Sequence, residues 1–217
     1  RQCPTCPVSI LLGVWFESKT VGWTAGYFGY LMTSADGGAS WAPQSPGTGQ
    51  TLRAVRFVGD KTGWIVGSRG TILRTDDGGL NWNPQTSGVI KRLNALWAAD
   101  GQIAWCSGES GTLLATVDGG VTWTPQSTGT NVELRGLAFE RDGLGWAVGD
   151  SGAILRTATG GAEYVPGDVD IDGTVTLADA AATLRCAAGL ASPTLRAAFV
   201  GDLDDDGALS VTDATAI

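Results

Sequence analysis

The feature that most constrains the fold of this chain is an uninterrupted repeat of 41 residues. Three sets of residues recur at that spacing: Trp41, Trp82, Trp123 and Tyr164; Trp23, Trp64, Trp105 and Trp146; Leu11, Leu52, Leu93 and Leu134. A period of about 20 to 50 residues is typical of architectures built from one repeated supersecondary unit. The sequence therefore predicts four such units, at about residues 8–48, 49–89, 90–130 and 131–166.

Each unit contains four short segments with strand character. In the second unit these are the apolar run Leu52–Phe57, the Gly-Trp segment Gly63–Gly67, the alternating segment Gly70–Thr75 and a segment that starts at Trp82. Short runs rich in β-branched and aromatic residues, separated by turns of Asp and Gly, are the signature of hairpin-connected strands. Four strands per repeat predict the blade of an all-β propeller with four visible blades.

The turn before the fourth segment has the same pattern in three of the units. It reads SADGGASW at 34–41, TDDGGLNW at 75–82 and TVDGGVTW at 116–123. We expect the Asp carboxylate to cap backbone N–H groups of its own turn, the Gly to take a positive φ and the Trp to pack over the hairpin. In the fourth unit Thr159 and Tyr164 replace the Asp and the Trp, which predicts a looser turn.

These turns resemble the Asp-box, or BNR repeat, of several protein families. Asp-boxes occur in sialidases, xyloglucan-degrading glycosidases, sortilin-type receptors and the photosystem II assembly factor family. Residues Thr62–Trp82 follow the pattern of the last family almost position by position, and the resemblance covers roughly 8–166. It implies a β-propeller, and it adds an assembly factor for a membrane complex to the candidate functions. Asp-boxes lie at blade peripheries and indicate the fold rather than the chemistry.

The sequence leaves the closure of the propeller open. In repeat register, Arg1–Pro7 takes the place of an outer fourth strand and is a candidate closing strand for the fourth blade. Four blades closing alone, association between chains, and a fragment of a longer propeller are the alternatives. The predicted propeller domain is 1–166.

A different pattern begins after Pro166 and predicts two calcium ions. Two twelve-residue segments, 168–179 and 202–213, place Asp at positions 1, 3, 5 and 12 and Gly at position 6, as calcium loops do. Position 7 offers a carbonyl and position 9 a hydroxyl. The predicted ligands are Asp168, Asp170, Asp172, Thr174, Thr176 and Asp179 in the first loop, and Asp202, Asp204, Asp206, Ala208, Ser210 and Asp213 in the second.

The two loops resemble a type I dockerin more than an EF-hand, because both end in Asp and neither has a helix leading into it. The resemblance implies a small α-helical calcium-binding module at 167–217, with a helix over Ala180–Leu190 and a truncated C-terminus. It also implies a cohesin-like protein partner. The alternative to partner binding is that calcium only stabilises a module whose own hydrophobic core is too small to fold it.

Charge and composition exclude several classes of function. The chain of 217 residues has a formal net charge of −8 and no His. The absence of a Lys and Arg cluster argues against a nucleic-acid surface, and the absence of His removes the most frequent acid–base residue and zinc ligand.

The four cysteines favour an extracellular location. Cys3 and Cys6 form a C-x-x-C pair beside prolines, where a disulfide within the pair or to Cys186 is favoured over a zinc or redox site. Cys106 is the fourth. We therefore expect a secreted protein whose calcium loops fill outside the cell.

Three functions fit these features. The main prediction is a non-catalytic extracellular calcium-binding module for protein interaction or assembly, whose partner is cohesin-like, another copy of itself or a glycan. The first alternative is a glycosidase, for which Glu109 and Asp150, 41 residues apart, are the best carboxylate pair. The second is the assembly factor, for which Arg53, Arg56, Arg92 and Arg135 are candidates for a basic patch near the channel, although salt bridges within the fold are the favoured use of these arginines.

Overall fold

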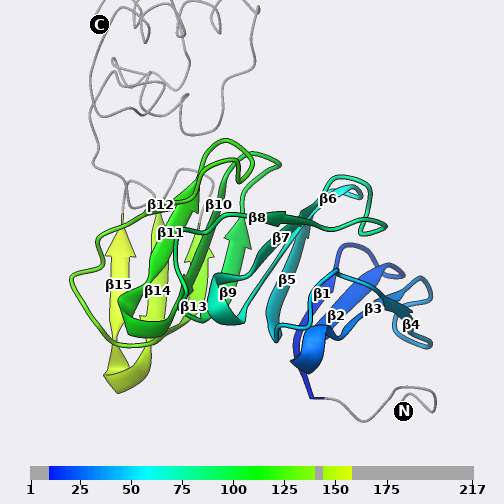
Figure 1. Cartoon of the computed structure of the whole chain (residues 1–217), viewed down its shortest axis with the longest axis horizontal. Helices are drawn as coiled ribbons and strands as arrows, with labels where there is room; N and C mark the ends of the chain where they lie inside the picture. Colours follow the sequence, from blue (N-terminus) through cyan, green and yellow to red (C-terminus); the bar gives the residue numbers. More distant parts are fainter. Residues whose placement is uncertain (1–9, 140–143, 158–217) are drawn as a thin grey trace, which may run out of the picture. The chain divides into compact units, whose positions relative to one another are not determined.

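The fold is that of a β-propeller, described in a computed structural model for residues 10–139 and 144–157 (Figure 1). The first blade contains β1 (Leu11–Phe16), β2 (Gly22–Gly26), β3 (Leu31–Ser34) and β4 (Ala42–Gln44). The second contains β5 (Leu52–Val58), β6 (Thr62–Gly67), β7 (Ile72–Thr75) and β8 (Asn83–Gln85). The third contains β9 (Leu93–Ala98), β10 (Ala104–Gly108), β11 (Leu113–Thr116) and β12 (Thr124–Pro125). The fourth contains β13 (Leu134–Phe139), β14 (Gly145–Gly149) and β15 (Ile154–Thr157).

Each blade is an antiparallel meander whose strands lie in chain order. The first three sheets have four strands and the fourth has three within the described residues. The register repeats with the sequence, since Trp15 pairs with Trp23, Arg56 with Trp64 and Trp97 with Trp105. Nearly all strand residues belong to one compact unit, Arg1–Ala138 with Trp146–Arg156. The prediction of an all-β propeller from the 41-residue repeat is therefore confirmed.

Neighbouring blades pack face to face through apolar clusters. Between the first and second blades, Trp23, Ala25 and Leu31 contact a face made by Leu52, Val55, Phe57, Ile65, Leu73 and Trp82. The Trp23 and Phe57 rings stack with centroids 3.7 Å apart. Between the second and third blades, Trp64, Val66 and Ile72 occupy the positions of Trp23, Ala25 and Leu31. The core of this fold therefore lies between sheets, and each blade needs a neighbour on both faces.

The second and third strands of every blade are joined by the same tight turn. The short 3-10 turns η1 (Tyr27–Gly29), η2 (Ser68–Gly70), η3 (Glu109–Gly111) and η4 (Asp150–Gly152) occupy these positions. Two successive residues have positive φ, for example Arg69 at 57° and Gly70 at 70°. This is the type I′ geometry that matches the twist of a hairpin. The predicted strand from Gly70 was wrong in its start, because Gly70 belongs to this turn and β7 begins at Ile72; likewise β8 begins at Asn83, not at Trp82.

The Asp-box turns have the predicted geometry. Asp77 accepts hydrogen bonds from the backbone N–H and the side-chain amide of Asn81 at 3.0 and 2.7 Å. The sequence did not indicate the second half of the motif, in which the hydroxyl of Thr75 donates to Asp77 and accepts the N–H of Gly79. Trp82 is 9% exposed and meets Phe57 edge-on. The turn therefore fixes the Trp that closes the blade interface.

Several predictions fall outside the described residues. These are the closing strand Arg1–Pro7, the looser fourth Asp-box with Thr159 and Tyr164, and the dockerin-like module at 167–217. In the described part of the chain, no helical segment is long and apolar enough to cross a membrane.

Candidate functional site

The candidate site is formed where the innermost strands of the second, third and fourth blades begin. Leu52, Leu93 and Leu134 are fully buried at the start of β5, β9 and β13. Polar residues flank these leucines in sequence: Arg53, Arg92, Asn94, Glu133 and Arg135. Because β5 lies beside β9 and Asn94 reaches Leu134, the repeat gathers these side chains into one basic cluster.

Glu133 is the centre of this basic cluster. Its Oε1 accepts hydrogen bonds from Nη2 of Arg92 and Nδ2 of Asn94, both at 2.9 Å, and its Oε2 lies 3.4 Å from Nη2 of Arg135. Nδ2 of Asn94 also donates to the carbonyl of Leu134 at 2.9 Å. The Glu133 side chain is only 17% exposed, so these donors stabilise a carboxylate that water reaches poorly.

Arg135 is held from its other side by Asp150 at the start of η4. Its Nε donates to one oxygen of Asp150 and its Nη2 to the other, at 3.0 Å for the latter. The hydrogen bond and the charge of Arg135 lower the pKa of Asp150, and Asp150 in turn raises the pKa of Arg135. Two of the three arginines in the cluster are therefore neutralised by carboxylates of the protein.

Arg53 differs from Arg92 and Arg135. It is half-buried, and within residues 10–139 and 144–157 no carboxylate lies within ion-pair distance of it. Its Nε is buried without a hydrogen-bond partner, a property that it shares with the Nε of Arg92. Burial lowers the pKa of Arg53 from its ordinary value and the like charge of Arg92 lowers it further, while the charge of Glu133 acts in the opposite direction. A guanidinium stays protonated under such conditions, so Arg53 is a half-buried cation with no carboxylate of the described residues within ion-pair distance.

A second arginine lies deeper along the same strand. The guanidinium of Arg56 is 4.6 Å from the ring centroid of Trp15 and 5.0 Å from that of Trp97. The three residues occupy equivalent positions in successive blades, so one arginine is enclosed between two tryptophans. Burial lowers the pKa of Arg56, and the charge of Glu17 opposes that shift. This arrangement accounts for Arg56 within the fold, as a cation–π stack.

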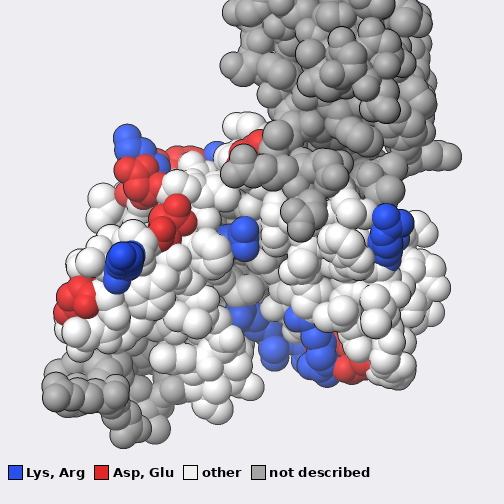
Figure 2. All heavy atoms as spheres, turned by 180° about the vertical axis from the view of Figure 1, so that it is seen from behind, with Lys and Arg blue, Asp and Glu red and all other residues white. Residues whose placement is uncertain are grey.

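The space-filling view agrees with a localised basic surface. The inner strands begin at the lower end of the blades in Figure 1, and Figure 2 shows basic side chains gathered next to an acidic one at the lower edge of the described residues. A half-buried guanidinium beside neighbours that are already paired with carboxylates favours a single carboxylate or a short acidic segment over a polyanion. The chemistry available here is anion binding.

Of the four arginines predicted to form a basic patch, only some are available to bind a ligand. Arg92 and Arg135 form ion pairs within the fold and Arg56 stacks on tryptophans, which leaves Arg53 as the residue that fits a ligand. Sequence reasoning missed Glu133 and Asn94, the residues that order the cluster. Their positions beside the repeated leucines were visible, but the pairing of side chains 39 to 41 residues apart was not.

The predicted carboxylate pair lies at equivalent turns, as the repeat requires. Glu109 begins η3, where its Oε2 accepts the backbone N–H of Arg92 at 3.3 Å, and Asp150 begins η4. The lowered pKa of Asp150 is the opposite of what a general acid needs. No group of three or more His, Cys, Asp or Glu residues in the described ranges is arranged to hold a metal ion.

Most of the other predicted site residues lie outside the described part of the chain. These are all twelve calcium ligands, from Asp168 to Asp213, and the cysteines Cys3, Cys6 and Cys186. Cys106 is a free, fully buried thiol whose pKa is raised by burial. It packs in the core between the second and third blades.

The repeated sheets and the three Asp-box turns define an Asp-box β-propeller. The chain belongs to the family described as Photosynthesis system II assembly factor YCF48, whose sequence profile matches residues 4–84 and 84–158. That description is of an assembly factor and not of an enzyme. A search of curated proteins gave no match.

Solved structures with the same fold include family members. A structure titled "YCF48 bound to D1 peptide" has a TM-score of 0.59 and 26% identity over 69% of this chain and 49% of that chain, so the present chain spans about half of that relative. YCF48 from Cyanidioschyzon merolae has a TM-score of 0.52 and 19% identity over 72% of this chain and 69% of that chain. An ancestral GH74 enzyme has a TM-score of 0.60 and 13% identity over 73% of this chain and 24% of that chain, a likeness of fold alone.

Proposed function

We propose that this chain is a non-catalytic assembly factor that binds an acidic segment of a partner protein at the basic cluster. The observation that carries the proposal is Arg53, a half-buried guanidinium without a carboxylate partner among the described residues. A carboxylate of the partner would give Arg53 an ion pair like those that Arg92 and Arg135 already form within the fold.

The geometry favours a peptide over other anions. Arg92 and Arg135 are bound by Glu133 and Asp150, so the cluster offers one strong anion position instead of an extended positive surface. The relative whose structure contains a D1 peptide supports a polypeptide ligand for this fold. The family description supports assembly of a membrane complex as the setting.

The glycosidase alternative has less support. Asp150, one member of the best carboxylate pair, has a lowered pKa that does not suit a general acid, and both of its oxygens are bound by Arg135, which leaves neither free to act as base or nucleophile. The ancestral GH74 enzyme resembles this chain at 13% identity, which indicates a shared fold and no more.

Peptide binding by the full chain tests the proposal. The D1 peptide and a peptide of the same length with its carboxylates replaced by amides are labelled, and their affinities are measured by fluorescence anisotropy. We expect Arg53→Ala to weaken binding of the D1 peptide about tenfold, because a half-buried ion pair is lost. The amide peptide should bind wild type and variant equally.

A matched control is available just beyond the same strand. Lys61 is exposed and follows the far end of β5, so Lys61→Ala removes one positive charge away from the cluster. Equal losses of affinity for Arg53→Ala and Lys61→Ala would show general charge attraction and would contradict a site at Arg53.

The sequence supports a second candidate function, calcium binding by an extracellular dockerin-like module. Two complete loops in series, 168–179 and 202–213, motivate it. Calorimetric titration of the full chain with calcium should give two ions bound per chain, and Asp172→Asn with Asp206→Asn should abolish both. Undiminished calcium uptake by that double variant would reject the assigned ligands.

A further inference from the structure

Phe28 combines an exposed aromatic side chain with an unfavourable backbone conformation. It lies at the tip of η1 with a φ of +58° and is 78% exposed. This left-handed region suits Gly, Asn and Asp, and it is unfavourable for a bulky residue. The turn does not require Phe, because its equivalents in the other three blades are polar, namely Arg69, Ser110 and Ser151, at nearly the same φ. Neither the turn nor burial therefore accounts for an aromatic residue at this tip.

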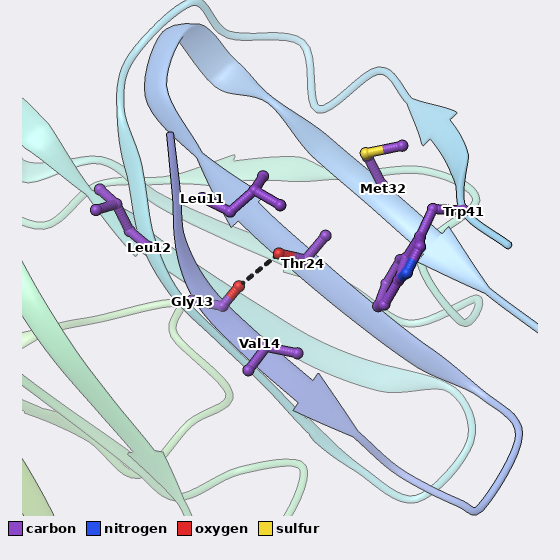
Figure 3. A pocket seen from close by; sticks show the side chains of 7 residues that line it. All are labelled: Leu11, Leu12, Gly13, Val14, Thr24, Met32 and Trp41. Atoms are coloured by element: carbon purple, nitrogen blue, oxygen red, sulfur yellow. Dashed lines mark hydrogen bonds between the residues drawn. The ribbon is translucent and has the colours of Figure 1, made fainter. Parts of the chain in front are cut away.

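The exposure of Phe28 is a property of the tip of the turn and not of a blade face. Arg69 and Ser110 are also exposed, although the second and third blades each contact a neighbour on both sides. Phe28 does not line the groove of about 420 Å³ on the face of the first blade, which is formed by residues of β1, β2 and β3 together with Trp41 (Figure 3). We therefore expect Phe28 to stay exposed whether or not a further blade packs on that face.

Phe28 lies at the same end of the blades as the basic cluster. Since β2 runs antiparallel to β1, η1 is at the end where the inner strands begin, and it contacts β5, the strand that carries Arg53. Burial and the like charge of Arg92 lower the pKa of Arg53, and Tyr27 is among the groups that oppose this shift, so the phenol of Tyr27 is within electrostatic range of the guanidinium. The rings of Tyr27 and Phe28 have centroids 6.1 Å apart. An aromatic pair therefore lies beside the arginine that fits a ligand.

We propose that Phe28 packs against an apolar side chain of the partner segment whose carboxylate binds Arg53, an inference that rests on the proposed function. The segment then has an aliphatic or aromatic residue close in sequence to an acidic one. Aromatic residues provide much of the contact energy at the centres of interfaces. The same contact excludes water from the ion pair and so strengthens it. Because charge alone attracts any acidic segment, Phe28 is the residue that provides selectivity.

Peptide binding by the full chain with Phe28→Asn tests the apolar contact. Asn is tolerated at a positive φ, so this variant removes the ring and keeps the turn. Fluorescence anisotropy measures the affinity of the D1 peptide and of a second D1 peptide whose aliphatic and aromatic residues are replaced by Ser. We expect Phe28→Asn to weaken binding of the D1 peptide about tenfold. The serine peptide should bind the wild type and the variant equally.

Leu80→Asn is the matched control for the loss of an exposed apolar side chain. Leu80 is 75% exposed but lies in the turn between β7 and β8, at the opposite end of the strands from the η turns. The affinity of Leu80→Asn for the D1 peptide should equal that of the wild type. A tenfold loss in this variant as well would show that exposed apolar residues attract the peptide in general, and it would overturn the contact at Phe28.

Urea denaturation of the same variant separates a binding role from a role in folding. The denaturation midpoint of Phe28→Asn should be at least as high as that of the wild type, because the substitution relieves backbone strain and removes no buried contact. A lower midpoint would show that the ring stabilises the fold and would contradict a binding role.

Arg53→Ala in the anisotropy assay distinguishes a failure of the apolar contact from a failure of the anion site. If Arg53→Ala weakens binding of the D1 peptide and Phe28→Asn does not, the anion site stands and the apolar contact is rejected. If neither variant weakens binding, the proposed function is rejected as well.

Discussion

Gly70 shows how little room the turns of this fold leave for a side chain. It has a φ of +70°, and a Cβ at this position would lie 1.9 Å from the carbonyl oxygen of Val89. Gly88 has nearly the same φ, +72°, but nothing lies within 4 Å of its Cβ position. The two glycines therefore share a conformation and differ only in their surroundings.

Replacing each of these glycines by alanine separates backbone strain from close packing. Gly88→Ala should lower the free energy of unfolding by about 1 to 2 kcal/mol, the cost of a left-handed residue. Gly70→Ala should lower the free energy of unfolding by about 1 to 3 kcal/mol more than Gly88→Ala does, because the backbone at Val89 must move away from the new methyl group. Urea denaturation measures both; equal losses would mean that the contact with Val89 is unimportant.

The Asp-box carboxylates make stability depend on pH at the acidic end. Hydrogen bonds from the side chain and backbone N–H of Ser40 lower the pKa of Asp36 to about 2, and those from the backbone N–H and side chain of Asn81 lower the pKa of Asp77 to about 2. Both values lie below the unfolded value of about 3.9. The stabilisation is therefore complete above about pH 4 and is lost as the pH falls toward 2.

Thermal unfolding across this range provides the measurement. The melting temperature of the wild type should fall between about pH 4 and pH 2. The melting temperature of the Asp77→Asn variant should fall less steeply over the same range. Asp60→Asn, which removes an exposed carboxylate outside the Asp-boxes, serves as the control. If the melting temperature of Asp77→Asn fell with pH as steeply as that of the wild type, the Asp77 carboxylate would not be a source of the pH dependence.

At the scale of the element, the inner strands stabilise the propeller by contacts between equivalent positions. The stack of Trp15, Arg56 and Trp97 joins β1, β5 and β9, three strands that share no hydrogen-bonded ladder. Arg56→Ala should lower the free energy of unfolding by about 2 kcal/mol through the loss of two cation–π contacts. Arg56→Lys should lose less, since it keeps the charge without the planar group.

The change is measured by urea denaturation with Lys61→Ala as the reference. Lys61 is exposed and should change stability by less than about 0.5 kcal/mol. If Arg56→Ala falls within that same margin, the stack is an incidental contact and not a link between blades.

Elements were predictable from the sequence where a periodic signal exists. The repeated Trp and Leu positions placed the blades, and the Asp-box motif placed the turn after the third strand. The type of the hairpin turns at Arg69 and Ser110 was not predicted, because type I′ turns are usually indicated by Asn-Gly or Asp-Gly and these carry Arg or Ser at a positive φ. The repeat predicts that the arginines of the inner strands lie near one another. Which of them form ion pairs with carboxylates depends on side-chain geometry that the repeat does not specify.

At the scale of the molecule, the described residues form successive blades and one basic cluster. The blades carry equivalent apolar faces because the repeat has no insertions. The basic cluster reflects differences between repeats: Arg53 and Arg135 replace the residue that is Leu12 in the first blade and Asn94 in the third. The residues that recur every 41 positions therefore determine the fold, and the residues that differ between repeats form the basic cluster.

We propose that a partner carboxylate binds at Arg53, and a crystal structure of the chain with the D1 peptide would locate that carboxylate. We expect it within ion-pair distance of the Arg53 guanidinium, with Glu133 still bound by Arg92 and Asn94. A peptide that lies along the Asp-box periphery instead, with Arg53 unoccupied, would contradict this proposal.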